Sequence, residues 1–282
     1  MSSYLAPAKL NLSLHVQPPR GDGYHELESL VQTIEWCDRL TVTPGEEGVD
    51  TFQSDFDEDL VQRALGELRK SHDVPPLALS LFKEIPVAAG LGGGSSDAAA
   101  ALVAGAEFGG IARDRLAAVA SSVGADVPLF LTGGTLMMRG IGEELEPLEP
   151  LDDFAVAIVV PHFGLETAEV YRRWDEMEGP TGSPLADAGL PPTLRGGMPM
   201  RNDLFPAAVD LEPRLGDFAA DIASVWGTAV SMTGSGSACF GYFATDDEAA
   251  DAAAVVADLA AEGRGVGLRP EGIARLDDPV DD

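Results

Sequence analysis

Lysine is scarce in this chain. Lys9, Lys70 and Lys83 are the whole set, and 18 basic residues face 47 acidic ones, which gives a formal net charge of −29. Nucleic-acid phosphates require clustered Lys and Arg, so this balance argues against a nucleic-acid-binding surface. An acidic, alanine-rich composition is typical of cytoplasmic proteins from salt-accumulating organisms, where ionic strength screens self-repulsion, although a merely acidic mesophilic protein fits as well.

Cysteine and long apolar runs are also lacking. Cys37 and Cys239 are an isolated pair, and neither they nor the four histidines show metal-ligand spacing. No apolar run approaches the ~18 residues of a membrane span, and the start of the chain lacks the charged and apolar regions of a signal peptide. We therefore expect a cytoplasmic protein, without membrane contact, whose 282 residues form one large or two medium domains.

The most informative stretch is a glycine-rich segment between Pro86 and Glu107. Four glycines fall within residues 90–94, and Ser95, Ser96 and Asp97 lead into an alanine-rich run at residues 98–101. Glycine permits positive φ and close approach of a ligand, and Ser or Asp before an Ala/Leu run is typical of a helix N-terminus. Because such a terminus attracts anions, the segment predicts a phosphate cradle, most naturally for a nucleotide.

Two other glycine loops are excluded by the residues themselves. A Walker-type loop ends in Gly-Lys-Ser/Thr, but no lysine follows Lys83. A dinucleotide fingerprint needs a third glycine three residues after the second, and Ser95 stands there after Gly92. A flexible linker is the remaining alternative, against which the capped apolar helix argues.

The N-terminal segment alternates apolar and polar residues from Leu10 to Val16 and predicts a strand. Lys9 and Asn11 share one face of that strand. A lysine on a solvent-facing strand is usually solubilising, but the rarity of lysine here favours a role that needs a compact ammonium group.

A predicted turn at Gly21–Gly23 is followed by Tyr24 and His25. One interpretation is a hairpin whose tyrosine packs on the core. The other is an aromatic platform with a hydrogen-bonding imidazole for a flat polar ring, and these residues alone leave both open.

Asp126 precedes Val127 and Pro128, where an aspartate commonly caps a turn. A carboxylate at the mouth of an apolar strand could also serve as general base for a hydroxyl. We expect strands at 129–131 and 136–139 to form a hairpin here.

The rest of the chain shows further periodic segments. The pattern predicts two strands within 27–43, helices at 60–71 and 249–262, strands at 77–82 and 154–160, a helix from Thr167, a mobile loop at 179–200, and a domain boundary at 143–153.

Seven motifs carry a resemblance that spans Ala6 to Gly241: APAKLNL, DGYHEL, GLGGGSSDAA, GADVPLFL, GIGE, RNDL and GSGSACFG. In this order they resemble the GHMP small-molecule kinase superfamily. Within it, they are similar to the family that phosphorylates the 2-hydroxyl of a cytidine diphosphate-linked methylerythritol in non-mevalonate isoprenoid (MEP pathway) synthesis. The resemblance implies an α+β, two-domain fold with ATP and Mg²⁺ in use and the active site in the cleft between the domains.

The resemblance also implies separate roles for the two halves of the chain and for two catalytic residues. Residues 1–150 would form the ATP-binding domain and residues 151–282 the domain that contributes to substrate binding. Asp126 would be the base that takes the hydroxyl proton, with Lys9 orienting it and stabilising the transferring phosphoryl group. No metal-ligating residue is implied, and a monomer or weak homodimer is expected.

Binding roles follow in the same way. Tyr24 and His25 would recognise cytosine, with Tyr171 as the second stacking face, and Asn11 would make a neighbouring polar contact. The implied ATP-binding residues are Lys83, Pro86, Gly90, Leu91, Gly92, Gly93, Gly94, Ser95 and Ser96. Those that would brace the glycine loop and the substrate phosphates are Thr233, Gly234, Ser235 and Gly236.

Two rival functions stay open from the sequence. One is another GHMP kinase of the mevalonate type, and the other is a non-catalytic nucleotide-binding regulator on the same fold. A serine hydrolase is excluded, because no G-x-S-x-G elbow occurs.

Overall fold

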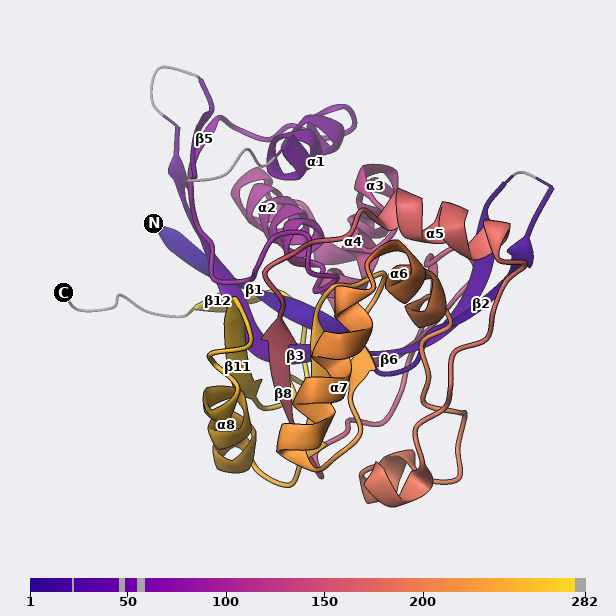
Figure 1. Ribbon diagram of the computed structural model, residues 1–282. Coiled ribbons are helices and arrows are strands. Elements are labelled where there is room, and N and C mark those ends of the chain that lie inside the picture. The colour runs from indigo at the N-terminus through magenta and orange to yellow at the C-terminus, as the bar shows by residue number, and fades with distance from the viewer. Residues whose placement is uncertain (22, 46–48, 55–58, 277–282) are drawn as a thin grey trace.

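A computed structural model describes residues 1–21, 23–45, 49–54 and 59–276 (Figure 1). Within this part of the chain, the first sheet runs in the order β12-β1-β3-β5-β4, with β2 and β6 paired to β3 and β7 paired to β6. Its strands are β1 (Ser2–Asn11), β2 (His15–Pro19), β3 (His25–Pro44), β4 (Thr51–Gln53), β5 (Leu77–Phe82), β6 (Thr135–Arg139), β7 (Glu144–Pro147) and β12 (Ala274–Leu276).

Strand β3 is a single element of 20 residues, so the prediction of two strands within 27–43 is wrong. Its neighbours change along its length: residues 29–32 pair with β6 and residues 39–44 pair with β5. A register shift between Pro7 and Ala8 of β1 lets the pair stay in contact as the strands bend. This one strand therefore links the core of the sheet to the β2–β3 hairpin.

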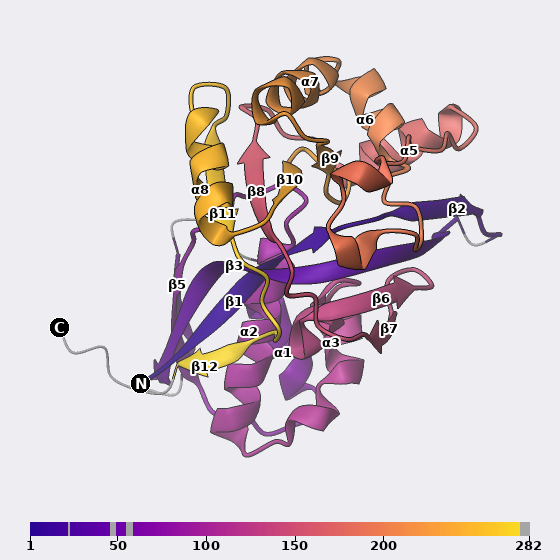
Figure 2. The same cartoon turned by 90° about the horizontal axis from the view of Figure 1, so that it is seen from below.

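One face of the first sheet is covered by helices α1 (Asp59–Arg69), α2 (Gly93–Gly109), α3 (Ala117–Val123) and α4 (Val127–Thr132), with the turn η1 (Arg113–Arg115) between α2 and α3 (Figure 2). Helix α2 is buried from Ser96 to Ala106. Its small alanine side chains let the helix lie close to β1, which explains an alanine-rich rather than leucine-rich sequence.

The second sheet runs β11-β8-β10-β9, formed by β8 (Ala155–Val160), β9 (Ser231–Met232), β10 (Cys239–Phe243) and β11 (Glu262–Val266). The predicted buried strand at 154–160 is confirmed, since every residue of β8 is buried. Val156 and Ile158 pack with first-sheet residues such as Leu10 and Trp36, while Ala157 packs against α8. Strand β8 has apolar neighbours on both faces, which accounts for its continuous apolar run.

The remaining elements are α5 (Thr167–Glu176), η2 (Asp187–Gly189), η3 (Pro192–Leu194), α6 (Phe205–Leu211), α7 (Arg214–Trp226) and α8 (Asp246–Val255). The α+β class is confirmed. The predicted helix at 249–262 ends early, because the chain must turn to place Glu262 beside Val160. Strand β12 returns to pair with β1, across the expected division at residue 150, and that division stays a prediction. Of the acidic segment from Ile273 to the end of the chain, residues 277–282 lie outside the described residues.

Candidate active site

A cavity of about 1150 Å³ is enclosed by β1, the β2–β3 hairpin, the segment from Lys83 to Ser95, helix α5 and the loop after β9. Most of the predicted site residues line it: Lys9, Asn11, Tyr24, His25, Lys83, Pro86, Gly90, Leu91, Gly92, Gly93, Gly94, Ser95, Asp126, Tyr171, Gly234 and Ser235. Ser96, Thr233 and Gly236 are buried just behind this lining. The structure thus gathers residues from six separate stretches of the chain around one space.

Lys9 lies at the end of β1 and is buried, with an exposed fraction of 5%. Its ammonium donates to Asn11 Oδ1 (2.6 Å) and to the carbonyl oxygen of Gly90 (2.8 Å), which confirms that Lys9 and Asn11 share one face. Burial lowers the pKa of Lys9, and the charge of Asp126 opposes that change. The ammonium is therefore fixed between the first strand and the glycine-rich loop, within the field of a carboxylate.

Asp126 precedes α4 and does not lie at the mouth of a strand, so the predicted hairpin through Leu129–Leu131 is wrong. Pro128 stands in the first turn of α4, a position that suits the fixed φ of proline. Asp126 lines the cavity. Burial, and then the charge of this carboxylate, raises the pKa of Tyr171 to about 12. Asp126 therefore interacts electrostatically with Tyr171 on α5 as well as with Lys9 on β1.

The glycine-rich loop needs glycine at two points. Gly90 has φ +79°, and a Cβ there would lie 2.5 Å from the carbonyl oxygen of Thr233. Gly92 has φ +75°, and its Cβ would lie 2.8 Å from the ring of Phe130 and 3.1 Å from Lys9 Cγ. A side chain would push the loop off both supports.

Helix α2 starts at Gly93, with Gly92 as its N-cap and no side-chain cap. The prediction of a Ser or Asp cap is wrong, because the helix begins two residues earlier and Ser95 falls in its first turn. Gly93, Gly94 and Ser95 line the cavity. The start of this 17-residue helix therefore borders the cavity, where its partial positive charge favours an anion.

The loop between β9 and β10 is hydrogen-bonded to β1, to the glycine-rich segment and to α5. The backbone N–H of Asn11 donates to Thr233 Oγ1 (2.9 Å), and that of Ala238 donates to the carbonyl oxygen of Ala89 (3.1 Å). Ser235 Oγ lies 2.8 Å from Thr167 Oγ1 at the start of α5. This loop joins β1, the glycine-rich loop and α5 into one wall.

Aromatic side chains form the other end of the cavity. Tyr24 is 60% exposed at the tip of the hairpin, so it does not pack in the core. The His25 ring lies 5.4 Å from that of Tyr171 and 5.3 Å from that of Trp174, between centroids. An open ring on one side and helix-borne rings on the other suit a flat ligand between them.

Comparison with known proteins decides the family. A family model of the GHMP kinases N terminal domain matches residues 59–134. The 4-diphosphocytidyl-2-C-methyl-D-erythritol kinase of Rhizobium johnstonii is 38% identical over 89% of this chain and 87% of its own, and that of Paramagnetospirillum magneticum is 40% identical over 88% and 91%. The chain belongs to the 4-diphosphocytidyl-2-C-methyl-D-erythritol kinase family. It is an ATP-dependent small-molecule kinase.

Solved structures agree on the fold of this family member. A crystal structure of a 4-(cytidine 5'-diphospho)-2C-methyl-D-erythritol kinase matches with a TM-score of 0.80 and 36% identity, over 94% of this chain and 98% of that one. Homoserine kinase from Cytophaga hutchinsonii matches with a TM-score of 0.71 at 17% identity, over 98% and 97%, which shows the shared GHMP fold alone.

Lys83 of this kinase lies between two carboxylates. Its ammonium is 2.7 Å from Asp38 Oδ2 on β3 and 2.5 Å from Asp97 Oδ2 on α2. These two charges raise the pKa of Lys83 in spite of its burial. The predicted nucleotide contact of Lys83 stays a prediction, while the geometry shows a cross-link between the sheet and the start of α2.

Sequence reasoning missed several lining residues on α5. Arg172 and Asp175 both face the cavity, Asp175 Oδ2 lies 3.3 Å from His25 Nε2, and Arg172 pairs with Glu176. His25 Nδ1 lies 3.0 Å from the carbonyl oxygen of Gln17. The available signal was the spacing of Asp175, which lies three residues after Arg172 and four after Tyr171, because such pairs are neighbours on the surface of one helix.

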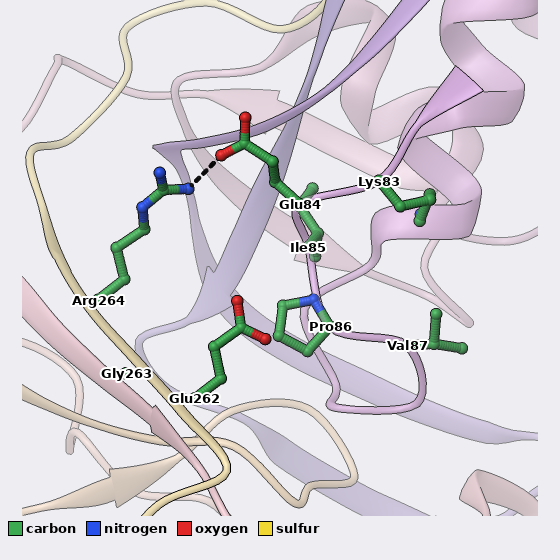
Figure 3. Close-up of a pocket in the computed structure, with 8 residues that line it drawn as sticks. All are labelled: Lys83, Glu84, Ile85, Pro86, Val87, Glu262, Gly263 and Arg264. Carbon is green, nitrogen blue, oxygen red and sulfur yellow. Dashed lines mark hydrogen bonds and ion pairs between the residues drawn. The ribbon is translucent and has the colours of Figure 1, made fainter. Parts of the chain in front are cut away.

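A second, smaller cavity of about 490 Å³ lies between the segment from Lys83 to Val87 and residues 262–264 of β11 (Figure 3). There the Arg264 guanidinium donates to Glu84 Oε2 (2.8 Å) and lies over the Trp36 ring at 5.4 Å. These contacts join β11 to the segment that leads into the glycine-rich loop.

Among the described residues, no group of three or more His, Cys, Asp or Glu side chains could hold a metal ion. Ser96 Oγ, in the first turns of α2, is buried without a hydrogen-bond partner in the part of the chain the structure describes.

No described helix is both long and apolar enough to cross a membrane.

Proposed function

We propose that this protein transfers the γ-phosphoryl group of ATP to the 2-hydroxyl of 4-diphosphocytidyl-2-C-methyl-D-erythritol, a step of non-mevalonate isoprenoid synthesis. The observation that carries the proposal is the position of Lys9 and Asp126. They line the same cavity, and the charge of Asp126 acts on Lys9. The glycine-rich loop contacts Lys9, and the aromatic side chains line the same cavity.

In this proposal Asp126 accepts the proton of the attacking hydroxyl. A positioned general base contributes about 100- to 10,000-fold to such a reaction. The Lys9 ammonium, held by Asn11 and Gly90, stays close to both Asp126 and the phosphate loop. Phosphoryl transfer depends mainly on positioning and on neutralising charge at the transferred group, which this arrangement supports.

The glycine-rich loop and the start of α2 would hold the ATP phosphates, with Thr233–Gly236 bracing them. Mg²⁺ would enter with ATP and neutralise phosphate charge. Ser95 lines the cavity at the start of α2, and the buried Ser96 hydroxyl beside it has no hydrogen-bond partner among the described residues, so these two serines would be the groups to meet the ion or a phosphate. Lys83 and Pro86 line the same cavity beside this loop.

Tyr24 and Tyr171 would stack on the cytosine, since each lines the cavity with an aromatic ring. His25 would provide polar recognition at the edge of the ring. Its two ring nitrogens face the Gln17 carbonyl and Asp175, and these contacts orient the imidazole at the cavity. We further propose a cytoplasmic location, with which the free thiols of Cys37 and Cys239 agree, and a monomer or weak homodimer.

The test is Mg-ATP-dependent phosphorylation of a panel of alcohols, with the product located by phosphorus NMR. We expect transfer to diphosphocytidyl-methylerythritol and not to methylerythritol or mevalonate. Transfer to mevalonate would favour the mevalonate-type kinase. ATP binding without transfer to any alcohol would favour a non-catalytic regulator.

A further inference from the structure

The segment Arg201–Leu204 has no role in the proposed chemistry, although it lies deep in the molecule. Asn202 has an exposed fraction of 4% and lies outside the cavity lining. A buried carboxamide is costly unless its hydrogen bonds are made, so its partners indicate what it does.

Those partners fix the side chain completely. Asn202 Nδ2 donates to the carbonyl oxygens of Met232 and Gly234, both at 2.8 Å. Asn202 Oδ1 accepts from the backbone N–H of Leu204 at 2.9 Å. One amide hydrogen therefore reaches the end of β9 at Met232, and the other reaches Gly234 in the loop between β9 and β10. The oxygen anchors the carboxamide to the start of α6.

That loop touches the reacting end of the cavity. A Cβ on Gly234 would lie 3.1 Å from the carbonyl oxygen of Gly90 and 3.2 Å from Lys9 Nζ. Gly234 and Ser235 also line the cavity. A shift of Gly234 by a few tenths of an ångström would be transmitted to Lys9 and to the glycine-rich loop, because no side chain separates them.

We propose that Asn202 is a positioning residue for phosphoryl transfer, whose carboxamide holds the loop at 233–237 against Lys9 and the glycine-rich loop. This inference rests on the proposed function. Misplacing reacting groups by about 1 Å can cost about 100-fold in rate even when the altered residue is remote. Asn202 acts through the loop and touches neither substrate.

The neighbouring Asp203 provides a matched control. It is equally buried, at 3%, and accepts from the backbone N–H groups of Val16 (3.1 Å) and Gly182 (2.8 Å). Its carboxylate also pairs with Arg201. Asp203 thus supports the same segment through different elements, since its described partners are Val16, Gly182 and Arg201.

The experiment compares Asn202→Ala, Asn202→Ser and Asp203→Asn in the phosphorylation assay, below the melting temperature of each variant. We expect kcat of Asn202→Ala to fall about 10- to 100-fold, with KM for the cytidylated alcohol within about twofold of wild type. Asn202→Ser keeps one donor and should lose less. Asp203→Asn should lower the melting temperature but keep kcat within about threefold of wild type.

Three results would overturn the inference. One is a folded Asn202→Ala with wild-type kcat. Another is an equal loss of kcat in Asn202→Ala and Asp203→Asn, which would mark a general structural effect. The third is failure of both Asn202 variants to fold while Asp203→Asn folds. A wild-type protein that transfers no phosphoryl group would instead refute the proposed function, and that arm is measured first.

Discussion

Lys9 and Lys83 are both buried at strand ends that border one cavity, yet their surroundings differ. The two ammonium contacts of Lys9 are neutral oxygens, on Asn11 and Gly90, and burial lowers its pKa. Lys83 lies between the carboxylates of Asp38 and Asp97, which raise its pKa. The comparison indicates that the Lys83 charge is neutralised by close carboxylates and stabilises the fold. The Lys9 ammonium has neutral oxygens as its hydrogen-bond partners, so its charge can act on a bound ligand.

The largest expected effect is on stability. Lys83→Met leaves two buried carboxylates without their common cation, so we expect the free energy of unfolding to fall by about 3–5 kcal/mol. Lys70, which is 70% exposed and pairs with Glu67, is the control, and Lys70→Met should cost less than about 1 kcal/mol. Urea titrations of both variants would check this. Equal losses would contradict the structural role assigned to Lys83.

Lys9→Met should affect catalysis instead. We expect kcat to fall about 100- to 1,000-fold, because a preorganised positive group at the transferring phosphoryl is lost. The lowered pKa of Lys9 also predicts an alkaline limb of kcat/KM, which reports the free enzyme, below pH 10.5, since deprotonation removes the same charge. A pH profile of the wild type checks this second point. Near-normal kcat in Lys9→Met would break the comparison between the two lysines.

Tyr171 tests the other end of the cavity. Tyr171→Leu removes a stacking ring, so KM for the cytidylated alcohol should rise about fivefold, which corresponds to about 1 kcal/mol. Tyr171→Phe keeps the ring and should leave KM within about twofold of wild type. Steady-state kinetics of both variants would check this. The stacking role fails if the two variants have the same KM.

The smallest effect concerns the whole molecule. A net charge of −29 opposes the approach of two anionic substrates, so added KCl should lower both KM values by about two- to threefold through screening. The measurement is kcat/KM against KCl concentration, with a neutral osmolyte as control. A rate that only falls with KCl would refute this expectation.

Much of the site could be predicted from local pattern. Period-two alternation at the N-terminus put Lys9 beside Asn11, and a continuous apolar run at 154–160 gave a strand that is buried on both faces. These features depend on burial, which the sequence encodes directly. That Lys9, Asp126 and Tyr171 converge on one cavity came from the resemblance, because tertiary contacts between distant segments leave no local signal.

The errors had physical causes. The run Val127–Leu131 is short, apolar and mostly buried, and such a run does not distinguish a helix from a strand. The glycines and prolines of 179–200 suggested a mobile loop, but Leu190 and Leu194 pack into the core between the sheets. Mobility of that segment stays a prediction. Leu190 and Leu194 are isolated apolar residues without a helical or strand period, so their burial could not be predicted from the pattern.

The most direct test of the account is the rate of phosphoryl transfer in Asp126→Asn, measured by rapid quench at saturating ATP and diphosphocytidyl-methylerythritol. The amide cannot accept the hydroxyl proton, so the account predicts a rate lower by about 100- to 10,000-fold, with ATP affinity nearly unchanged. A transfer rate comparable to that of the wild type would contradict it.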